Sequence, residues 1–202
     1  MALDKDLVEA QGVEEHPLGF FSFPDSKILM MGSFPPPKKR WVMDFYYPNR
    51  NNDMWRIFGL IFFNDGFHFL TPDRKHYKEA ELRAFLRVKG FALGDTAQAV
   101  IREKNNASDK HLIVVRPLDL AQVLQGMPQC HTLITTGQKS SDILAPILHT
   151  TDPKVGEKIE VEFASHGLLT WWRMPSSSRA YPKPLEWKAD FYRKVFASIG
   201  LC

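Results

Sequence analysis

Three short stretches of this sequence combine aromatic, amide, hydroxyl and basic side chains, the groups with which proteins hold a nucleobase and a phosphodiester. The first begins with Gly-Ser-Phe-Pro at residues 32–35 and continues through Tyr46 and Tyr47 to the amides Asn49, Asn51 and Asn52. The second is Thr-Gly-Gln-Lys-Ser-Ser at 136–141, and the third is Arg-Met-Pro-Ser-Ser-Ser-Arg at 173–179. Together they predict a site for a base and its phosphate backbone.

Each stretch also has an ordinary structural interpretation. Gly-Ser-x-Pro forms turns, a tyrosine pair packs in cores, serine-rich segments are common in loops, and Gly137 with Gln138 can begin a helix. Ligands of open α/β sheets, however, bind beyond the carboxyl ends of the strands. All three stretches follow predicted strands, so their shared edge favours one binding site.

Several other kinds of site are disfavoured by what the sequence lacks. Cys130 and Cys202 are far apart without CxxC spacing, and the seven histidines show no HxxxH or HxH pairing. This pattern argues against a disulfide scaffold, a zinc site or an iron–sulfur cluster, so we expect no metal and no cofactor. No Gly-x-Ser-x-Gly elbow and no GxGxxG is present, which argues against a serine hydrolase and a dinucleotide oxidoreductase.

Length and composition indicate one globular unit. The 202 residues predict a single domain over 1–202, with 1–16 as a loose N-terminal lead-in. The net charge of +3 and pI of about 8.8 are compatible with a phosphate-binding face but do not require one. Acidic residues interrupt the N-terminus, and no stretch reaches the roughly 18 apolar residues of a membrane helix. We therefore expect a cytoplasmic protein.

Apolar periodicity predicts alternating strands and helices. Strands are expected at 28–32, 91–96, 132–136 and 167–174, with a hairpin arm at 159–163. Helices are expected at 52–63, 78–89, 119–124, 137–148 and 185–199, with a helical turn at 98–103 before an NNASDK loop and a short apolar segment at 111–115. The predicted fold is α/β, a three-layer α/β/α arrangement with a small, about four-stranded and mainly parallel sheet.

The first and third stretches resemble the uracil-DNA glycosylase superfamily. The matching segments are ILMMGSFPP followed by FYYPNRNNDMW, and RMPSSSRAYPKP, within a resemblance that runs from about residue 16 to 196. The similarity is greatest to the branch of hypoxanthine-DNA (deoxyinosine) or G/U mismatch-specific glycosylases. That branch carries an aromatic residue where Met54 stands here.

The resemblance implies a base-excision repair enzyme. Such an enzyme hydrolyses the N-glycosidic bond of a deaminated base, uracil or hypoxanthine, after flipping it out of DNA. Other branches place a catalytic Asp or Asn two residues after the first glycine, where this chain has Phe34. The water-orienting amide is therefore expected at Asn52, with Asp44 as a carboxylate that could instead act as general base.

The resemblance also implies how base and DNA are held. Gly32, Ser33, Phe34 and Pro35 would form the pocket wall, and Tyr47 would stack on the base. The DNA backbone would meet the third stretch, the start of the helix after residue 136, and a basic turn, in which the expected residues are Pro175, Ser176, Ser177, Ser178, Arg179, Gly137, Gln138, Lys139, Lys38 and Lys39.

Two questions stay open at this level. The same fold could serve as a catalytically inactive DNA-binding module, which would bind damaged DNA without releasing a base. The identity of the excised base also depends on a few hydrogen bonds whose geometry the sequence does not give. A monomer suits a protein that must embrace DNA.

Overall fold

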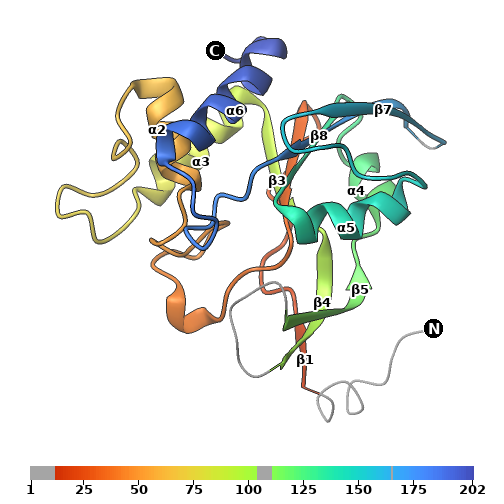
Figure 1. Cartoon of the computed structure of the whole chain (residues 1–202), viewed down its shortest axis with the longest axis horizontal. Helices are drawn as coiled ribbons and strands as arrows, with labels where there is room; N and C mark the ends of the chain where they lie inside the picture. The colour runs from red at the N-terminus through yellow and green to blue at the C-terminus, as the bar shows by residue number, and fades with distance from the viewer. Residues whose placement is uncertain (1–11, 104–110, 165) are drawn as a thin grey trace.

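The computed structural model describes residues 12–103, 111–164 and 166–202 (Figure 1). It centres on a five-stranded sheet of order β3-β2-β6-β8-β7. Strands β2 (Ile28–Gly32), β3 (Phe91–Asp95), β6 (Thr132–Thr136) and β8 (Gly167–Met174) are parallel. β7 (Lys158–Phe163) is the antiparallel edge and forms the predicted hairpin with β8. The predicted α/β class with a mainly parallel sheet is confirmed, with five strands rather than about four.

Helices cover both faces of this sheet (Figure 1). On one face, Ile28 and Met30 of β2 pack in a core with α2 (Met54–Phe63), α3 (Glu79–Lys89) and α6 (Leu185–Ser198). On the other face, Leu29 and Met31 pack with α4 (Leu120–Gln125) and α5 (Gln138–Ile147). Successive residues of a strand point to opposite faces, so burial on both sides requires the continuous apolar run that β2 shows.

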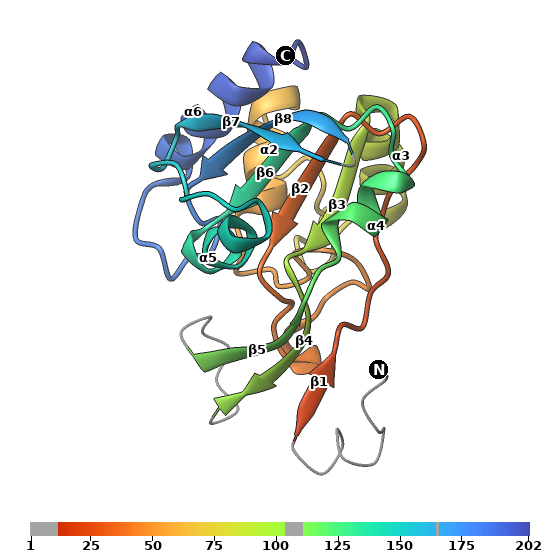
Figure 2. The same ribbon diagram turned by 90° about the vertical axis from the view of Figure 1, so that its right-hand side faces the viewer.

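A second, antiparallel sheet of order β1-β4-β5 lies beyond the carboxyl ends of the parallel strands (Figure 2). It contains β1 (Val13–Glu15), β4 (Ala97–Arg102) and β5 (Leu112–Pro117). The predicted helical turn at 98–103 is therefore wrong. Ala97, Ala99 and Val100 are buried, and β4 pairs on both sides, with β1 and with β5. Of these two partners β1 is distant in sequence, and a short apolar run does not by itself distinguish a strand from a helical turn.

The remaining elements lie near their predicted positions. The predicted helix at 52–63 begins at Met54, and Gly90 ends α3 with a left-handed backbone, as a C-terminal glycine does. A short 3-10 helix, η1 (Lys38–Arg40), follows the proline run. The expected NNASDK loop lies outside the described residues, as do residues 1–11 of the expected loose lead-in, whereas residues 13–15 of that lead-in form β1. Within the described ranges, no helix is long and apolar enough to cross a membrane.

Candidate functional site

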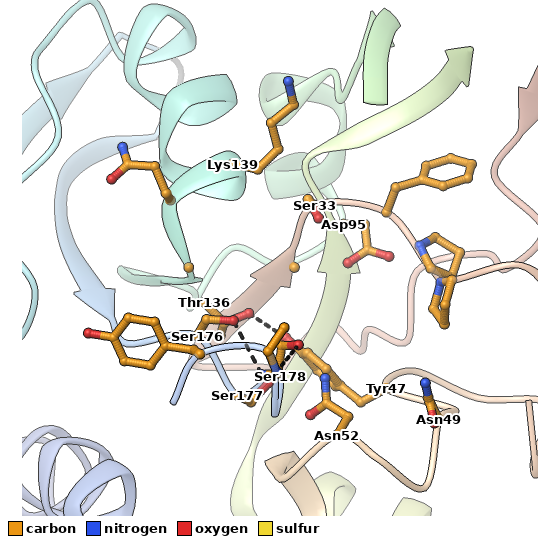
Figure 3. A pocket seen from close by; sticks show the side chains of 18 of the residues that line it. Ser33, Tyr47, Asn49, Asn52, Asp95, Thr136, Lys139, Ser176, Ser177 and Ser178 are labelled. Carbon is orange, nitrogen blue, oxygen red and sulfur yellow. Dashed lines mark hydrogen bonds between the residues drawn. The ribbon is translucent and has the colours of Figure 1, made fainter. Parts of the chain in front are cut away.

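A cavity of about 970 Å³ opens at the carboxyl ends of the parallel strands (Figure 3). Its wall includes the last residue of each of these four strands, namely Gly32, Asp95, Thr136 and Met174. A volume of this order accommodates a small organic ligand such as a nucleotide. The position is the one that parallel α/β sheets offer for ligand binding.

The structure brings the three predicted stretches together around this cavity. The lining includes most of the residues expected to hold base and DNA, namely Gly32, Ser33, Phe34, Pro35, Tyr47, Asn52, Gly137, Gln138, Lys139, Pro175, Ser176, Ser177 and Ser178. Four expected residues, Asp44, Lys38, Lys39 and Arg179, do not line it. Arg40, next to Lys39 in η1, does line it, so the basic turn approaches the cavity through that side chain.

Asp44 does not face the cavity. Its side chain is 77% exposed and forms an ion pair with Lys38, which is also exposed. Asp44 is not among the residues that line the cavity on which Tyr47 and Asn52 converge. The structure therefore gives no support to Asp44 as a general base for this cavity.

Tyr47 is held with its ring at the cavity wall (Figure 3). Its backbone adopts a φ of 50°, which is uncommon for a residue other than glycine and often marks a functional position. The hydroxyl shares a hydrogen bond of 3.1 Å with Thr136 Oγ1, and the ring packs edge-on against Trp55. Burial, with a smaller contribution from the charge of Asp95, raises the pKa of Tyr47. The side chain is thus a neutral, fixed aromatic surface.

Asn52 has both a structural contact and a position in the cavity wall (Figure 3). Its Oδ1 accepts a hydrogen bond of 2.9 Å from the backbone N–H of Met54, which satisfies one of the free donors at the start of α2. This bond fixes the side chain through Oδ1 and does not involve the amide N–H₂ group. Asn52 also forms an isolated antiparallel bridge with Ser178, so the first and third stretches are in backbone contact.

Asp95 is a cavity residue that the sequence analysis did not identify. It ends β3, is 5% exposed, and its Oδ2 lies 2.9 Å from Nε2 of His16. Gly32 makes room for it, because a Cβ at residue 32 would lie 2.5 Å from Asp95 Oδ1. Residue 95 falls within the predicted strand at 91–96, and His16 falls at the end of the predicted lead-in over 1–16. A useful signal would have been an acidic residue at the end of a predicted buried strand, at the same edge as the other stretches.

The His16–Asp95 pair holds protons more tightly than the isolated groups do. Burial raises the pKa of Asp95, and His16 offsets this only in part. Burial lowers the pKa of His16, but its hydrogen bond to Asp95 and the charge of that carboxylate outweigh burial and raise the pKa above 6.5. The result is a buried acid–base couple at the cavity wall, with Phe34 packed edge-on against the imidazole.

The start of α5 is less open to a phosphate than the sequence suggests. The N–H of Gly137 already donates to the carbonyl of Met174 at 3.1 Å. Arg173 donates to the side chain of Gln138 and also binds Asp152. Gly137 itself has a φ of 104° and lies close to Ser176, so a side chain there would be strained. Lys139 remains as the basic side chain of this helix start.

Metal ligation has no support in the described ranges. They contain no group of three or more His, Cys, Asp or Glu side chains placed to hold a metal ion. Cys130 is buried and Cys202 is exposed, and both are free thiols. The side chains that line the cavity offer amides, hydroxyls, aromatic rings, cations and the carboxylates of Asp95 and Asp142.

Comparisons with known proteins place the fold. No protein-family model matches the sequence, and no curated protein matches it. Among solved structures, the chain is similar to a protein from Methanosarcina acetivorans that is provisionally named a uracil DNA glycosylase and was solved in solution by NMR. The identity is 20% and the TM-score 0.56, over 91% of this chain and 98% of that one. This likeness shows that the two chains share a fold.

Proposed function

We propose that this protein is a DNA glycosylase that hydrolyses the N-glycosidic bond of a deaminated base, uracil or hypoxanthine, flipped out of DNA. The observation that carries the proposal is the convergence of Tyr47, Asn52 and the 176–178 serines on one cavity at the carboxyl ends of the strands. Such a cavity offers a stacking surface, a polar group for water and a loop for the backbone. The fold shared with a provisionally named uracil DNA glycosylase agrees with it.

In this proposal the chemical step needs no metal or cofactor. The bond between C1′ and the base nitrogen breaks, and its electron pair leaves with the base. A water oxygen bonds C1′, and the water gives up a proton while the departing base gains one. Asn52 orients this water or steadies the developing charge, and its fixed rotamer means that little reorganisation is required. Tyr47 holds the base by stacking.

Asp95 would explain why this protein prefers deaminated bases. An ionised carboxylate only accepts hydrogen bonds. Uracil carries an N–H at N3 and hypoxanthine an N–H at N1, whereas cytosine and adenine have lone pairs at those positions. In its ionised form Asp95 would therefore favour the deaminated base over its parent. We further propose that the activity is of the hypoxanthine-DNA or G/U mismatch-specific type. We also propose that the protein acts as a monomer in the cytoplasm.

The test is a base-release assay. Duplexes with U·G, hypoxanthine·T or xanthine·C pairs are incubated with the protein, and abasic sites are then cleaved with alkali. We expect strand scission with at least one lesion, reduced about 100-fold or more by Asn52→Ala.

Asp44→Asn is the matched control, because Asp44 lies outside the cavity, and it should retain full activity. If Asn52→Ala were fully active and Asp44→Asn inactive, the proposed roles would be reversed. No scission with any lesion, together with tight binding of the same duplexes, would favour the inactive DNA-binding module.

A further inference from the structure

A buried lysine connects the last helix to the third predicted stretch. Lys188 lies in α6, and its side chain is only 1% exposed. Its Nζ donates to Asp53 Oδ2 at 3.1 Å and to the backbone carbonyl of Ser178 at 2.9 Å. One ammonium group therefore joins α6 and the nearby 176–179 loop to Asp53, which is 135 residues away in the sequence.

Asp53, next to Asn52, is the centre of this cluster. Its Oδ1 accepts from Arg179 Nε at 3.0 Å and from Arg56 Nη1 at 3.3 Å, so one carboxylate binds three cations. Its backbone N–H donates to the carbonyl of Ser177 at 2.9 Å. Side-chain and backbone contacts of the same residue thus hold the 176–179 loop against the Asn52 turn.

The cost of burial indicates that the cluster has a specific role. Removing a lysine and an aspartate from water is unfavourable before their attraction is counted, and an apolar pair of similar size is often at least as stable. Lys188 is surrounded on α6 by the apolar core residues Ala189, Tyr192 and Val195, so an apolar residue would also suit the packing of this face. What an apolar residue would not supply is a donor to the carbonyl of Ser178.

We propose that Lys188 and Asp53 are positioning residues that lock the 176–179 loop to the Asn52 turn. None of the four charged residues of the cluster lines the cavity, whereas Asn52, Ser177 and Ser178 do. The cluster acts from outside by keeping these two walls at a fixed separation. This inference rests on the proposed function for its effect on catalysis, but the lock itself is a property of the structure.

The experiment compares Lys188→Met with Lys194→Met, an exposed lysine on the same helix. Hydrogen exchange reports the lock directly, through the amide of Asp53, which donates to Ser177, and the amide of Tyr181, which donates to Ser178. We expect both amides to exchange about tenfold or more faster in Lys188→Met, with core strands β2 and β6 unchanged. Lys194→Met should match the unaltered protein.

Single-turnover kinetics then report the consequence. We expect base release to slow by roughly 10- to 100-fold in Lys188→Met, because small misplacement of reacting groups has effects of this size. The Kd for the same duplex should change by less than about threefold, because the loop still presents its own contacts. If Lys188→Met does not fold, the double variant Asp53→Asn/Lys188→Met removes both charges and should fold, with the same fast exchange.

Each outcome has one meaning. Unchanged exchange of the Asp53 and Tyr181 amides would overturn the lock, whatever the kinetics show. Faster exchange with an unaltered rate of base release would overturn its role in catalysis. If exchange is faster in Lys188→Met but the unaltered protein releases no base, the lock is supported and the proposed function is overturned.

Discussion

At residue 32, the absence of a side chain decides whether a carboxylate can enter the cavity. We expect Gly32→Ala to displace Asp95, because the added Cβ would lie 2.5 Å from Oδ1. Overpacking of a buried site costs about 1–3 kcal/mol. Base release should fall as well, and urea unfolding with the base-release assay would measure the two effects.

Gly19→Ala is the control for that substitution. No atom lies within 4 Å of a Cβ added there, so stability and base release should both stay near those of the unaltered protein. A Gly32→Ala protein as stable and as active as Gly19→Ala would mean that Asp95 relaxes without cost or has no part in the reaction.

The His16–Asp95 pair predicts a pH dependence of stability. Both pKa values are raised by folding, so the folded state binds protons more tightly than the unfolded chain. For His16 this stabilisation is complete below pH 6.5 and is lost as pH rises through the higher folded pKa. For Asp95 the sign is the same, with loss beginning above pH 3.8. Stability from the pair therefore declines as pH rises.

The measurement is the free energy of unfolding from pH 6 to pH 8. The difference between the unaltered protein and His16→Gln should shrink across this range. His76→Gln, at an exposed position, gives the effect of the same replacement away from the cavity. A difference that grows with pH would show that the sign is wrong.

At the scale of elements, the three cations on Asp53 predict unequal effects of removing either partner. In Lys188→Met, Asp53 keeps Arg56 and Arg179, so the loss should be about 1–3 kcal/mol. In Asp53→Asn, Lys188 stays buried and loses the one carboxylate that pairs with it in the described part of the chain, so the loss should be about 3–5 kcal/mol. Urea unfolding of the two variants would test the order, and Lys188→Met as the more destabilised protein would contradict it.

Elements with a local signal could be predicted from the sequence, and those that depend on distant partners could not. The apolar run at 28–32 and the glycine that ends α3 are local features, and both predictions hold. Strand β4 pairs with the distant segment 13–15, which no local pattern reveals, and its short apolar run does not distinguish it from a helical turn. The site divides in the same way. The meeting of the three stretches could be predicted, because each follows a parallel strand. The contact of His16 with Asp95 could not, because the two residues are 79 positions apart in the sequence.

At the scale of the whole molecule, a net charge of +3 says little about DNA binding until the cations are placed. Arg40 and Lys139 line the cavity, whereas Lys38 is engaged with Asp44 outside it. The basic residues that meet DNA should therefore be few. The acidic Asp142 and the Arg173–Asp152 pair lie near Lys139 at the start of α5. Their carboxylates limit how many phosphates can bind there.

This placement predicts how DNA affinity depends on salt. Each phosphate contact contributes about −0.9 to the slope of log K against log salt concentration, because binding releases a condensed counterion. Lys139→Ala should reduce the steepness by roughly one such contact, with similar losses for damaged and undamaged duplexes. Fluorescence anisotropy titrations at several salt concentrations would measure the slopes, with Lys194→Ala as the exposed control on α6. A slope unchanged by Lys139→Ala would mean that the backbone does not pass the start of α5, and DNA would have to approach the cavity from the side of η1 and Arg40.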